Sequence, residues 1–317
     1  MKPVCIGIDI GGTNTEFGLI TKSGEILTKS KIKTQEFKSA EKFIQTLSDE
    51  INKLLREQNI STIEGIGIGA PNANYFNGTI EFAPNLPWKG IIPLTNLINK
   101  YFDTKIIITN DANAAAIGEK IYGSAKILND FIMITLGTGL GSGIFSNGSL
   151  IYGHDGNAGE LGHTIYDVNG RLCGCGRRGC LETYVSATGF VRTAVEILEL
   201  NEKNSILRNI KPENLSAKMI DDAAKQNDEI ALETFEITGK ILGFKLADVV
   251  AITSPEVIIL FGGLAQAGEL IINPTKKYME QFLLPIFKNK VTIQRSELPE
   301  NSAALLGAGA LIWGFNK

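Results

Sequence analysis

Histidine and cysteine are scarce in this chain, with two and four residues among 317. An excess of one charge is missing as well, because 31 Lys and Arg stand against 34 Asp and Glu, for a formal net charge of −3. Such a chain offers no electrostatic footprint for nucleic acid or for an anionic membrane surface. We therefore expect neither as a partner, and any anionic ligand must be bound by local groups.

Long apolar runs are also lacking. The N-terminal apolar stretch meets a charge at Asp9, too early for a secretory signal. The longest nearly uncharged apolar stretch, residues 303–315, is shorter than the roughly 17 residues that a membrane-spanning helix needs. These features predict a cytoplasmic protein without a membrane span.

What is present is the composition of a globular protein, with 44% hydrophobic and 21% charged residues. At about 100–200 residues per domain, the length predicts two domains, each with a core of its own.

A pattern of apolar strand, glycine turn and second apolar strand occurs twice. It covers residues 4–20 and returns over residues 131–145, so the two halves of the chain are expected to be similar. Further strands are expected over residues 26–32, 63–68, 105–109 and 256–261, and helices after Ser39 and over residues 112–121, 228–251 and 302–315. The pattern predicts an α/β protein.

The glycine turns suggest phosphate binding. Glycine at a strand end lets the backbone approach a phosphate and present its N–H groups. Asp9, just before the first turn, would be repelled by phosphates unless Mg²⁺ or a water lies between them. The nucleotide-binding candidates are Asp9, Gly11, Gly12, Thr13, Gly137, Thr138, Gly139, Gly262 and Gly263. Taken singly, each turn is better explained as an ordinary hairpin or strand end, but the order of the turns and the repeated pattern favour nucleotide binding. A P-loop is excluded, because the Gly-Lys pair at 239–240 is followed by Ile241.

Three of the four cysteines fall within eight residues. Together with one histidine they form the ligand set of a closed tetrahedral zinc site, His163, Cys173, Cys175 and Cys180. Four protein ligands leave no open position, so the metal is expected to be structural. The alternative is a cluster of free thiols.

Polar residues next to this cluster and after the strand at 105–109 suggest a sugar site. Glu160 and Glu182 flank the cluster and could present carboxylates to sugar hydroxyls, although a single Glu is usually a solvated surface charge. Asp111 is the candidate general base for transfer of a phosphoryl group to an alcohol, and Asn110 can bind a further hydroxyl. Asp111 could instead serve only as the N-cap of the following helix.

These motifs resemble the ROK family of sugar kinases and repressors, within the actin-like ATPase superfamily, over nearly the whole chain. The resemblance rests on residues 6–13, 136–139 and 261–263, and above all on residues 160–163 and 173–182. Asn14 and Asn72 depart from the family pattern, where Lys and Gly are common.

The resemblance implies two RNase H-like domains with an interdomain cleft. We expect a first domain over residues 1–109 plus 302–317 and a second, with the zinc loop, over 110–301. It further implies ATP, Mg²⁺ and structural Zn²⁺ as cofactors, a homodimer or homotetramer, and Asp111 as the base. The hexose-binding residues would be Asn85, Asn110, Glu160, His163 and Glu182.

Within this family, residues 84–89 and the short spacer between His163 and Cys173 look most like glucokinases. The expected reaction is ATP-dependent phosphorylation of glucose at its 6-hydroxyl, an ATP:hexose 6-phosphotransferase of carbohydrate metabolism. One alternative is an N-acetylglucosamine or N-acetylmannosamine kinase. Two others, from different classes, are a non-catalytic sugar sensor of the repressor type and a filament-forming ATPase.

Overall fold

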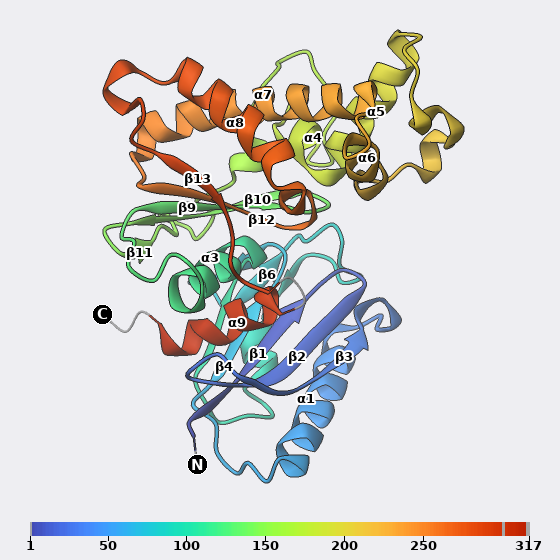
Figure 1. Cartoon of the computed structure of the whole chain (residues 1–317). Coiled ribbons are helices and arrows are strands. Elements are labelled where there is room, and N and C mark those ends of the chain that lie inside the picture. The colour runs from blue at the N-terminus through green and yellow to red at the C-terminus, as the bar shows by residue number, and fades with distance from the viewer. Residues whose placement is uncertain (1, 300–301, 315–317) are drawn as a thin grey trace. The chain divides into compact units, whose positions relative to one another are not determined.

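The computed structural model describes residues 2–299 and 302–314 and divides the chain into two compact units. The first unit comprises residues 1–127, 149–158 and 297–317, and the second comprises residues 128–148 and 159–296 (Figure 1). Among the described residues, no helix is long and apolar enough to cross a membrane.

The first unit is built on a mixed sheet with the strand order β3-β2-β1-β4-β8. β1 pairs antiparallel with β2 and parallel with β4, and β4 pairs parallel with β8. The strands are β1(Val4–Ile10), β2(Asn14–Thr21), β3(Ile26–Lys33), β4(Ile66–Gly69) and β8(Ile106–Thr109). The short strands β5(Ala73–Asn74), β6(Thr79–Glu81) and β7(Ile91–Ile92) form a separate small sheet, and β11(Ser149–Leu150) begins the segment 149–158.

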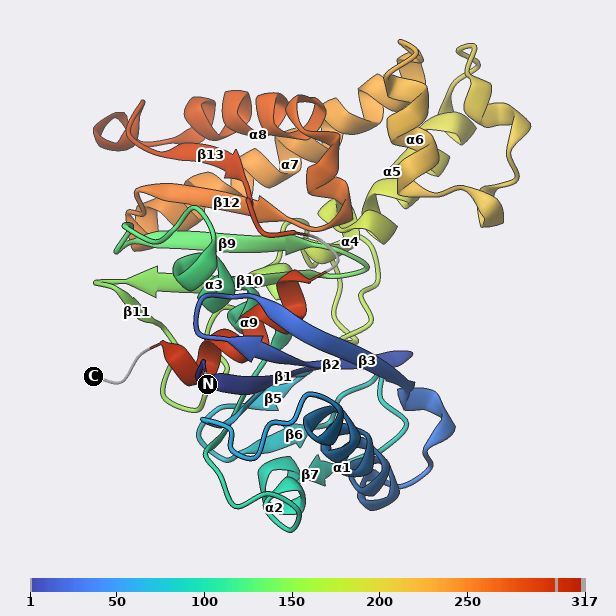
Figure 2. The same cartoon turned by 60° about the horizontal axis from the view of Figure 1, so that its bottom comes forward.

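Helices cover both faces of this sheet. Successive residues of a strand point to opposite faces. Ile6 and Ile8 of β1 belong to the core with α1(Ala40–Glu57), whereas Cys5 packs with α9(Ala303–Trp313). In Figure 2, α1 and α9 lie on opposite sides of the sheet. The unit also contains η1(Thr34–Glu36), α2(Leu94–Ile98) and α3(Asp111–Tyr122).

The second unit repeats this plan. β9(Phe131–Leu136) and β10(Leu140–Ser146) form the antiparallel hairpin, and β12(Val257–Phe261) and β13(Thr292–Arg295) continue the sheet in parallel, in the order β10-β9-β12-β13. Helices α7(Glu229–Thr253) and α8(Glu269–Phe282) lie together over one face of the sheet (Figure 1). The remaining elements are η2(Leu161–His163), α4(Glu182–Val185), α5(Ala187–Leu200), η3(Ile206–Asn209), η4(Pro212–Asn214), α6(Ala217–Ala224), η5(Gly263–Ala267) and η6(Pro285–Phe287).

The predicted elements are confirmed to within a few residues at their ends. The strand over residues 131–136 is found as predicted, and Ser39 caps α1 by accepting a hydrogen bond from the Lys42 N–H. The predicted helix over 302–315 is present as α9, which ends at Trp313, while Phe315 lies outside the described residues.

The division into domains differs from the prediction in three segments, because residues 110–127 and 149–158 belong to the first unit and its C-terminal segment begins at residue 297 instead of 302. α3 belongs to the first unit, because it packs on α9 so closely that a Cβ on Gly307 would collide with the Ala114 carbonyl oxygen. Residues 149–158 belong there too, since Asn74 Nδ2 donates to the Asp155 carbonyl oxygen at 2.8 Å and the rings of Tyr75 and Tyr152 stack at 4.1 Å. Both contacts join residues far apart in the sequence, where periodicity gives no signal.

Candidate functional site

Two carboxylates meet at the carboxyl edge of the first sheet. Asp9 of β1 pairs with Gly69 of β4, and Gly69 pairs with Thr109 of β8, which α3 follows. A Cβ on Gly69 would lie 3.9 Å from both Asp9 Oδ1 and Asp111 Cα. Asp9 and Asp111 therefore both lie next to Gly69 at this edge, close enough for the charge of Asp111 to raise the pKa of Asp9, and α/β proteins commonly bind ligands at such an edge.

The surroundings of these carboxylates disfavour their charged forms. Desolvation, reinforced by the charges of Asp111 and Glu16, raises the pKa of Asp9 to about 7. Desolvation also raises the pKa of Asp111, although this side chain is still reached by solvent and two backbone hydrogen bonds oppose the shift. A bound cation would offset the cost of charging two neighbouring carboxylates, and a carboxylate with a raised pKa is a stronger proton acceptor once it is ionised. The pair is therefore suited to binding a cation or to proton transfer.

The N-cap of α3 is Asn110 rather than Asp111. The Asn110 side-chain oxygen accepts a hydrogen bond from the Asn113 N–H at 2.7 Å, while Asp111 is the first residue of the helix. The interpretation of Asp111 as only an N-cap is therefore wrong. Capping occupies one lone pair of the Asn110 amide oxygen, and its amide nitrogen retains donor capacity toward a ligand.

The loop that carries Asn85 lies against the first glycine turn. A Cβ on Gly12 would lie 2.7 Å from the Asn85 carbonyl oxygen, so glycine is needed there for close approach of the two segments. Trp88 anchors the loop by donating from Nε1 to the Phe37 carbonyl oxygen at 3.0 Å. The structure thus brings Asn85 and the turn of Gly11, Gly12 and Thr13 together in the first unit.

Asn72 explains one departure from the family pattern. Its φ of 50° is in the left-handed region, which glycine adopts most easily and which asparagine tolerates better than most residues. Its side-chain nitrogen also donates to the Glu81 carbonyl oxygen at 3.0 Å. Asparagine therefore keeps the backbone geometry and adds a hydrogen bond to β6.

In the second unit, the second and third glycine turns are adjacent. Gly262, with a φ of 99°, follows β12, and a Cβ there would lie 2.7 Å from the Leu136 carbonyl oxygen at the end of β9. On Gly137 and Gly263, by contrast, a Cβ would meet no atom of the described residues within 4 Å. Packing accounts for glycine at Gly262, and open space beside the other two is consistent with a ligand.

The second turn is held by the start of α5. The N–H of Ala187 donates to the Gly137 carbonyl oxygen at 2.8 Å, and Thr188 Oγ1 donates to the Thr138 carbonyl oxygen at 2.9 Å. These bonds use carbonyl oxygens and so do not occupy the N–H groups of Thr138 and Gly139, which could serve phosphate binding. Gly137 N–H itself donates to the Gly139 carbonyl oxygen at 3.1 Å.

Glu182 connects this turn to the cysteines. One carboxylate oxygen accepts from the Leu140 N–H at 2.9 Å, directly after Gly139, and the other lies 3.8 Å from Cys173 Sγ. Part of the acceptor capacity of Glu182 is thus used within the chain. Its position is consistent with a wall of a ligand site, but its first role in the structure is to hold the turn.

The predicted metal ligands form a compact cluster. The donor atoms of His163, Cys173, Cys175 and Cys180 all lie within 4.8 Å of one another. The Sγ atoms of Cys175 and Cys180 are 3.6 Å apart, and His163 Nδ1 is 3.8 Å from Cys173 Sγ. Three sulfurs and one imidazole nitrogen fit a structural zinc ion.

One thiol of the cluster is prepared for metal binding. Although desolvation acts in the opposite direction, hydrogen bonds from the backbone and side chain of Arg177 lower the pKa of Cys175 to about 6. The thiolate, which is the form that binds metals, therefore predominates at neutral pH.

Glu160 is exposed and lies immediately before η2, which contains His163.

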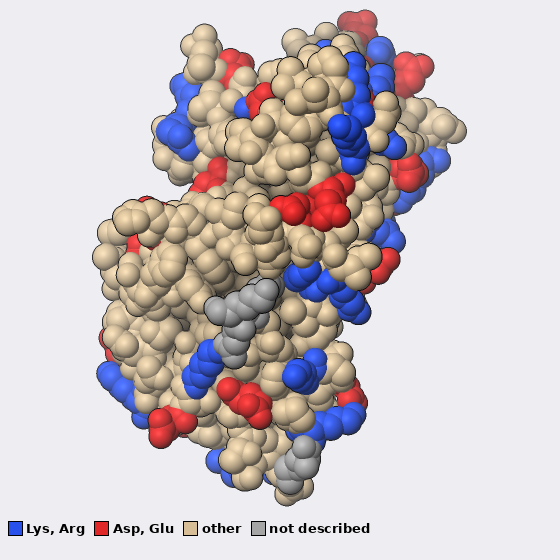
Figure 3. Space-filling model, turned by 90° about the vertical axis from the view of Figure 1, so that its left-hand side faces the viewer, with Lys and Arg blue, Asp and Glu red and all other residues tan. Residues whose placement is uncertain are grey.

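The candidate residues are thus brought together in two sets. The first unit holds Asp9, the first turn, Asn85, Asn110 and Asp111, and the second unit holds the other two turns, Glu160, Glu182 and the metal cluster. Basic and acidic side chains are interspersed on the face shown in Figure 3, in keeping with the balanced composition.

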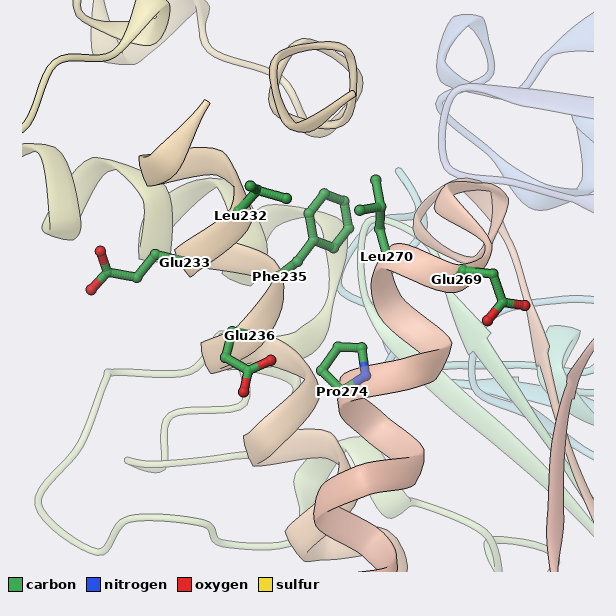
Figure 4. Close-up of a pocket in the computed structure, with 7 residues that line it drawn as sticks. All are labelled: Leu232, Glu233, Phe235, Glu236, Glu269, Leu270 and Pro274. Atoms are coloured by element: carbon green, nitrogen blue, oxygen red, sulfur yellow. The ribbon is translucent and has the colours of Figure 1, made fainter. Parts of the chain in front are cut away.

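A separate cavity of about 430 Å³ opens between α7 and α8 (Figure 4). Its lining contains none of the predicted site residues and consists of Leu232, Glu233, Phe235, Glu236, Glu269, Leu270 and Pro274.

Sequence reasoning missed Arg171. This arginine precedes the first cysteine of the cluster by two residues, and its side chain is only 8% exposed. A buried arginine has no periodicity or motif of its own, so its partners become visible only in the folded chain.

The fold and these sites place the protein in the actin-like ATPase class, as two RNase H-like units with glycine turns at strand ends. The family model "ROK family" matches residues 5–314, and the chain belongs to this family.

Relatives of known activity include both kinases and repressors. A glucokinase of Thermotoga maritima is 34% identical over 309 residues, covering 97% of this chain and 96% of its own length. A ROK family glucokinase from Streptomyces griseus, solved with glucose and AMPPNP, has a TM-score of 0.80 and 32% identity, covering 97% of this chain and 98% of its own. A xylose repressor of Caldicellulosiruptor bescii is 28% identical, covering 97% of this chain and 77% of its own length. The glucokinase relatives support a sugar kinase.

Proposed function

We propose that the protein phosphorylates glucose at its 6-hydroxyl with ATP. The observation that carries this proposal is the placement of two carboxylates, Asp9 and Asp111, beside the first glycine turn at the carboxyl edge of the first sheet. The similarity to glucokinases along nearly the whole chain supports the choice of sugar and nucleotide.

Asp111 is the general base in this proposal. Its raised pKa strengthens it as a proton acceptor, so it takes the proton of the 6-hydroxyl as that oxygen attacks the terminal phosphorus of ATP. Asn85, Asn110, Glu160, His163 and Glu182 would bind the remaining sugar hydroxyls and hold the 6-hydroxyl in line. Each is a hydrogen-bonding side chain, as recognition of a hexose requires.

The glycine turns would bind the nucleotide. The first and second turns would supply backbone N–H groups to the phosphates. The turn of Gly262 and Gly263 would bind the adenosine, with the open space beside Gly263 and with Gly262 packed on the end of β9. Asp9 would hold Mg²⁺, directly or through water, and the ion when bound neutralises charge that develops on the phosphates. The cysteine cluster would hold structural zinc and keep His163 in one orientation, with its second ring nitrogen as a donor.

Two alternatives keep part of this scheme. An N-acetylglucosamine or N-acetylmannosamine kinase would use the same base and turns with a different contact at C2 of the sugar. A non-catalytic sensor would bind sugar without turnover, and the similarity to xylose repressors is the observation that favours it. We further propose that the protein acts as a homodimer or homotetramer.

The test is sugar-dependent release of ADP from ATP and Mg²⁺ with glucose, N-acetylglucosamine, N-acetylmannosamine, mannose and fructose. The proposal predicts the highest kcat/KM with glucose. A higher kcat/KM with an N-acetyl sugar would change the assigned substrate but leave the proposed mechanism unchanged. If the protein binds a sugar but phosphorylates none of the five, the kinase proposal is contradicted and the sensor is favoured. ATP hydrolysis that is independent of sugar would favour a filament-forming ATPase.

A further inference from the structure

Arg171 connects the cysteine loop, defined here as residues 164–181, with two helices. Its guanidinium group is buried, with an exposed fraction of 8%, and lies 4.5 Å from the centre of the Tyr184 ring. A buried guanidinium is retained only when its donors are satisfied. The acceptors here are the Thr183 carbonyl oxygen at 2.6 Å, the Gly189 carbonyl oxygen at 3.2 Å, Thr193 Oγ1 at 2.9 Å and Glu196 Oε2 at 2.5 Å.

The backbone of Arg171 is fixed to the cysteine loop. Its N–H donates to the Tyr184 hydroxyl at 3.1 Å, and its carbonyl oxygen accepts from the Gly179 N–H at 2.8 Å, one residue before Cys180. Cys173 is two residues further along the chain. The position of Arg171 therefore restrains both ends of the segment that carries the three thiols.

The side-chain partners lie on the same elements that support the second glycine turn. Thr183 is on α4, whose first residue, Glu182, accepts from the Leu140 N–H. Gly189, Thr193 and Glu196 are on α5, whose first turn donates to the carbonyl oxygens of Gly137 and Thr138. One side chain is thus bonded to both helices that hold the turn.

We propose that Arg171 is a positioning residue that couples the metal cluster to the nucleotide turn. Binding of a metal orders the cysteine loop, and binding of a nucleotide orders the turn at Gly137–Thr138. Because Arg171 joins the loop to the supporting helices, ordering one reduces the entropic cost of ordering the other. The inference rests on the proposed function, since it takes ATP as the ligand of the turn and zinc as the ligand of the cluster.

The coupling is measured as the change in zinc affinity on addition of nucleotide. Zinc-loaded protein is titrated with a zinc-selective chelator, with Mg²⁺ in both arms and saturating ADP in one. Couplings between sites in proteins are commonly about 5–150-fold in affinity. We expect ADP to tighten zinc binding at least about fivefold in the unmodified protein, and the coupling to fall to about onefold in Arg171→Met.

Arg192→Met is the matched control. Arg192 pairs with the same carboxylate, Glu196, at 3.0 Å, but it is half exposed, and none of its hydrogen bonds among the described residues reaches the cysteine loop. This variant should keep the full effect of ADP on zinc affinity. Arg171→Lys should retain only part of it, because an ammonium group cannot reach all four acceptors at once.

Two further measurements keep the test decisive. If Arg171→Met does not fold, Glu196→Gln removes the charge of one partner and should lower the coupling without removing the arginine. Isothermal titration with MgADP separates the possible failures. If MgADP binds and zinc affinity does not change in the unmodified protein, the coupling is refuted while the proposed function stands. If MgADP or zinc does not bind, the coupling is refuted because its basis in the proposed function has failed.

Discussion

At the scale of single residues, the site depends on where carboxylates lie relative to strand ends. Asp9 and Asp111 are both recognisable from sequence, because each stands at the end of an apolar strand. Their proximity is seen only in the folded chain, where both lie next to Gly69 of β4 and the charge of Asp111 contributes to the raised pKa of Asp9. Sequence alone did not reveal that Asn110, not Asp111, caps α3, because both residue types are good N-caps and only the geometry distinguishes them.

Asp111→Asn tests the general base. The substitution keeps the size and hydrogen-bonding shape of the side chain but removes the proton acceptor, so kcat should fall at least about 10²-fold while sugar affinity changes little. Steady-state kinetics and sugar titration measure the two effects. Asp103→Asn, at an exposed aspartate, is the control. Near-normal turnover by Asp111→Asn would refute the assignment.

The raised pKa of Asp9 predicts that the stability of the protein depends on pH in an unusual way. Its pKa rises from 3.8 to about 7 in the folded protein, so the folded state binds more protons than the unfolded state between these values. The contribution of Asp9 to the free energy of unfolding therefore decreases as pH rises from about 4 to about 7. Asp9→Asn should melt at a higher temperature than the unmodified protein at pH 8 but not at pH 4.

In the unmodified protein, Mg²⁺ should restore the stability that is lost as the pH rises. A cation bound at Asp9 favours the charged carboxylate, so Mg²⁺ should raise the melting temperature at pH 8 more than at pH 5. The same comparison with Asp9→Asn is the control, and an equal effect of Mg²⁺ on both proteins would rule out Asp9 as its ligand.

At the scale of elements, the sequence is most informative where a local pattern determines the structure. The two strand–turn–strand hairpins were predicted because apolar runs and glycines alternate within a few residues, and β1, β2, β9 and β10 confirm them. The dual use of Glu182 was not predicted, because its bond to the Leu140 N–H joins residues 42 positions apart. The assignments of individual site residues to ligands remain predictions.

The cysteine loop should depend on its metal. The donor atoms of the cluster converge within 4.8 Å, and replacement of Cys175 by Ser removes one ligand, so zinc affinity should fall by at least about tenfold. Sugar affinity should fall with it, because His163 loses its fixed orientation. Metal analysis and sugar titration of Cys175→Ser measure both. Zinc-free protein with full sugar affinity would contradict the proposed role of the metal.

At the scale of the whole molecule, the folding of the first unit depends on its C-terminal helix. α9 packs on β1, β4 and α3, and a Cβ on Gly67 of β4 would overlap the Ala308 backbone. Backbone atoms cannot move aside as a flexible side chain can. Gly67→Ala should therefore destabilise the protein by about 1–3 kcal/mol, measured by urea unfolding. Gly263→Ala is the control, because a Cβ there meets nothing within 4 Å and the backbone is not in the left-handed region.

The chain passes from one unit to the other four times, between residues 127 and 128, 148 and 149, 158 and 159, and 296 and 297. Neither unit is therefore encoded by one uninterrupted stretch of the gene. A recombination event that exchanged one contiguous half for that of a relative would join strands and helices of different ancestry inside the same core. The two units must be inherited together. A substitution in one segment is tolerated only if it still packs against segments that are far away in the sequence.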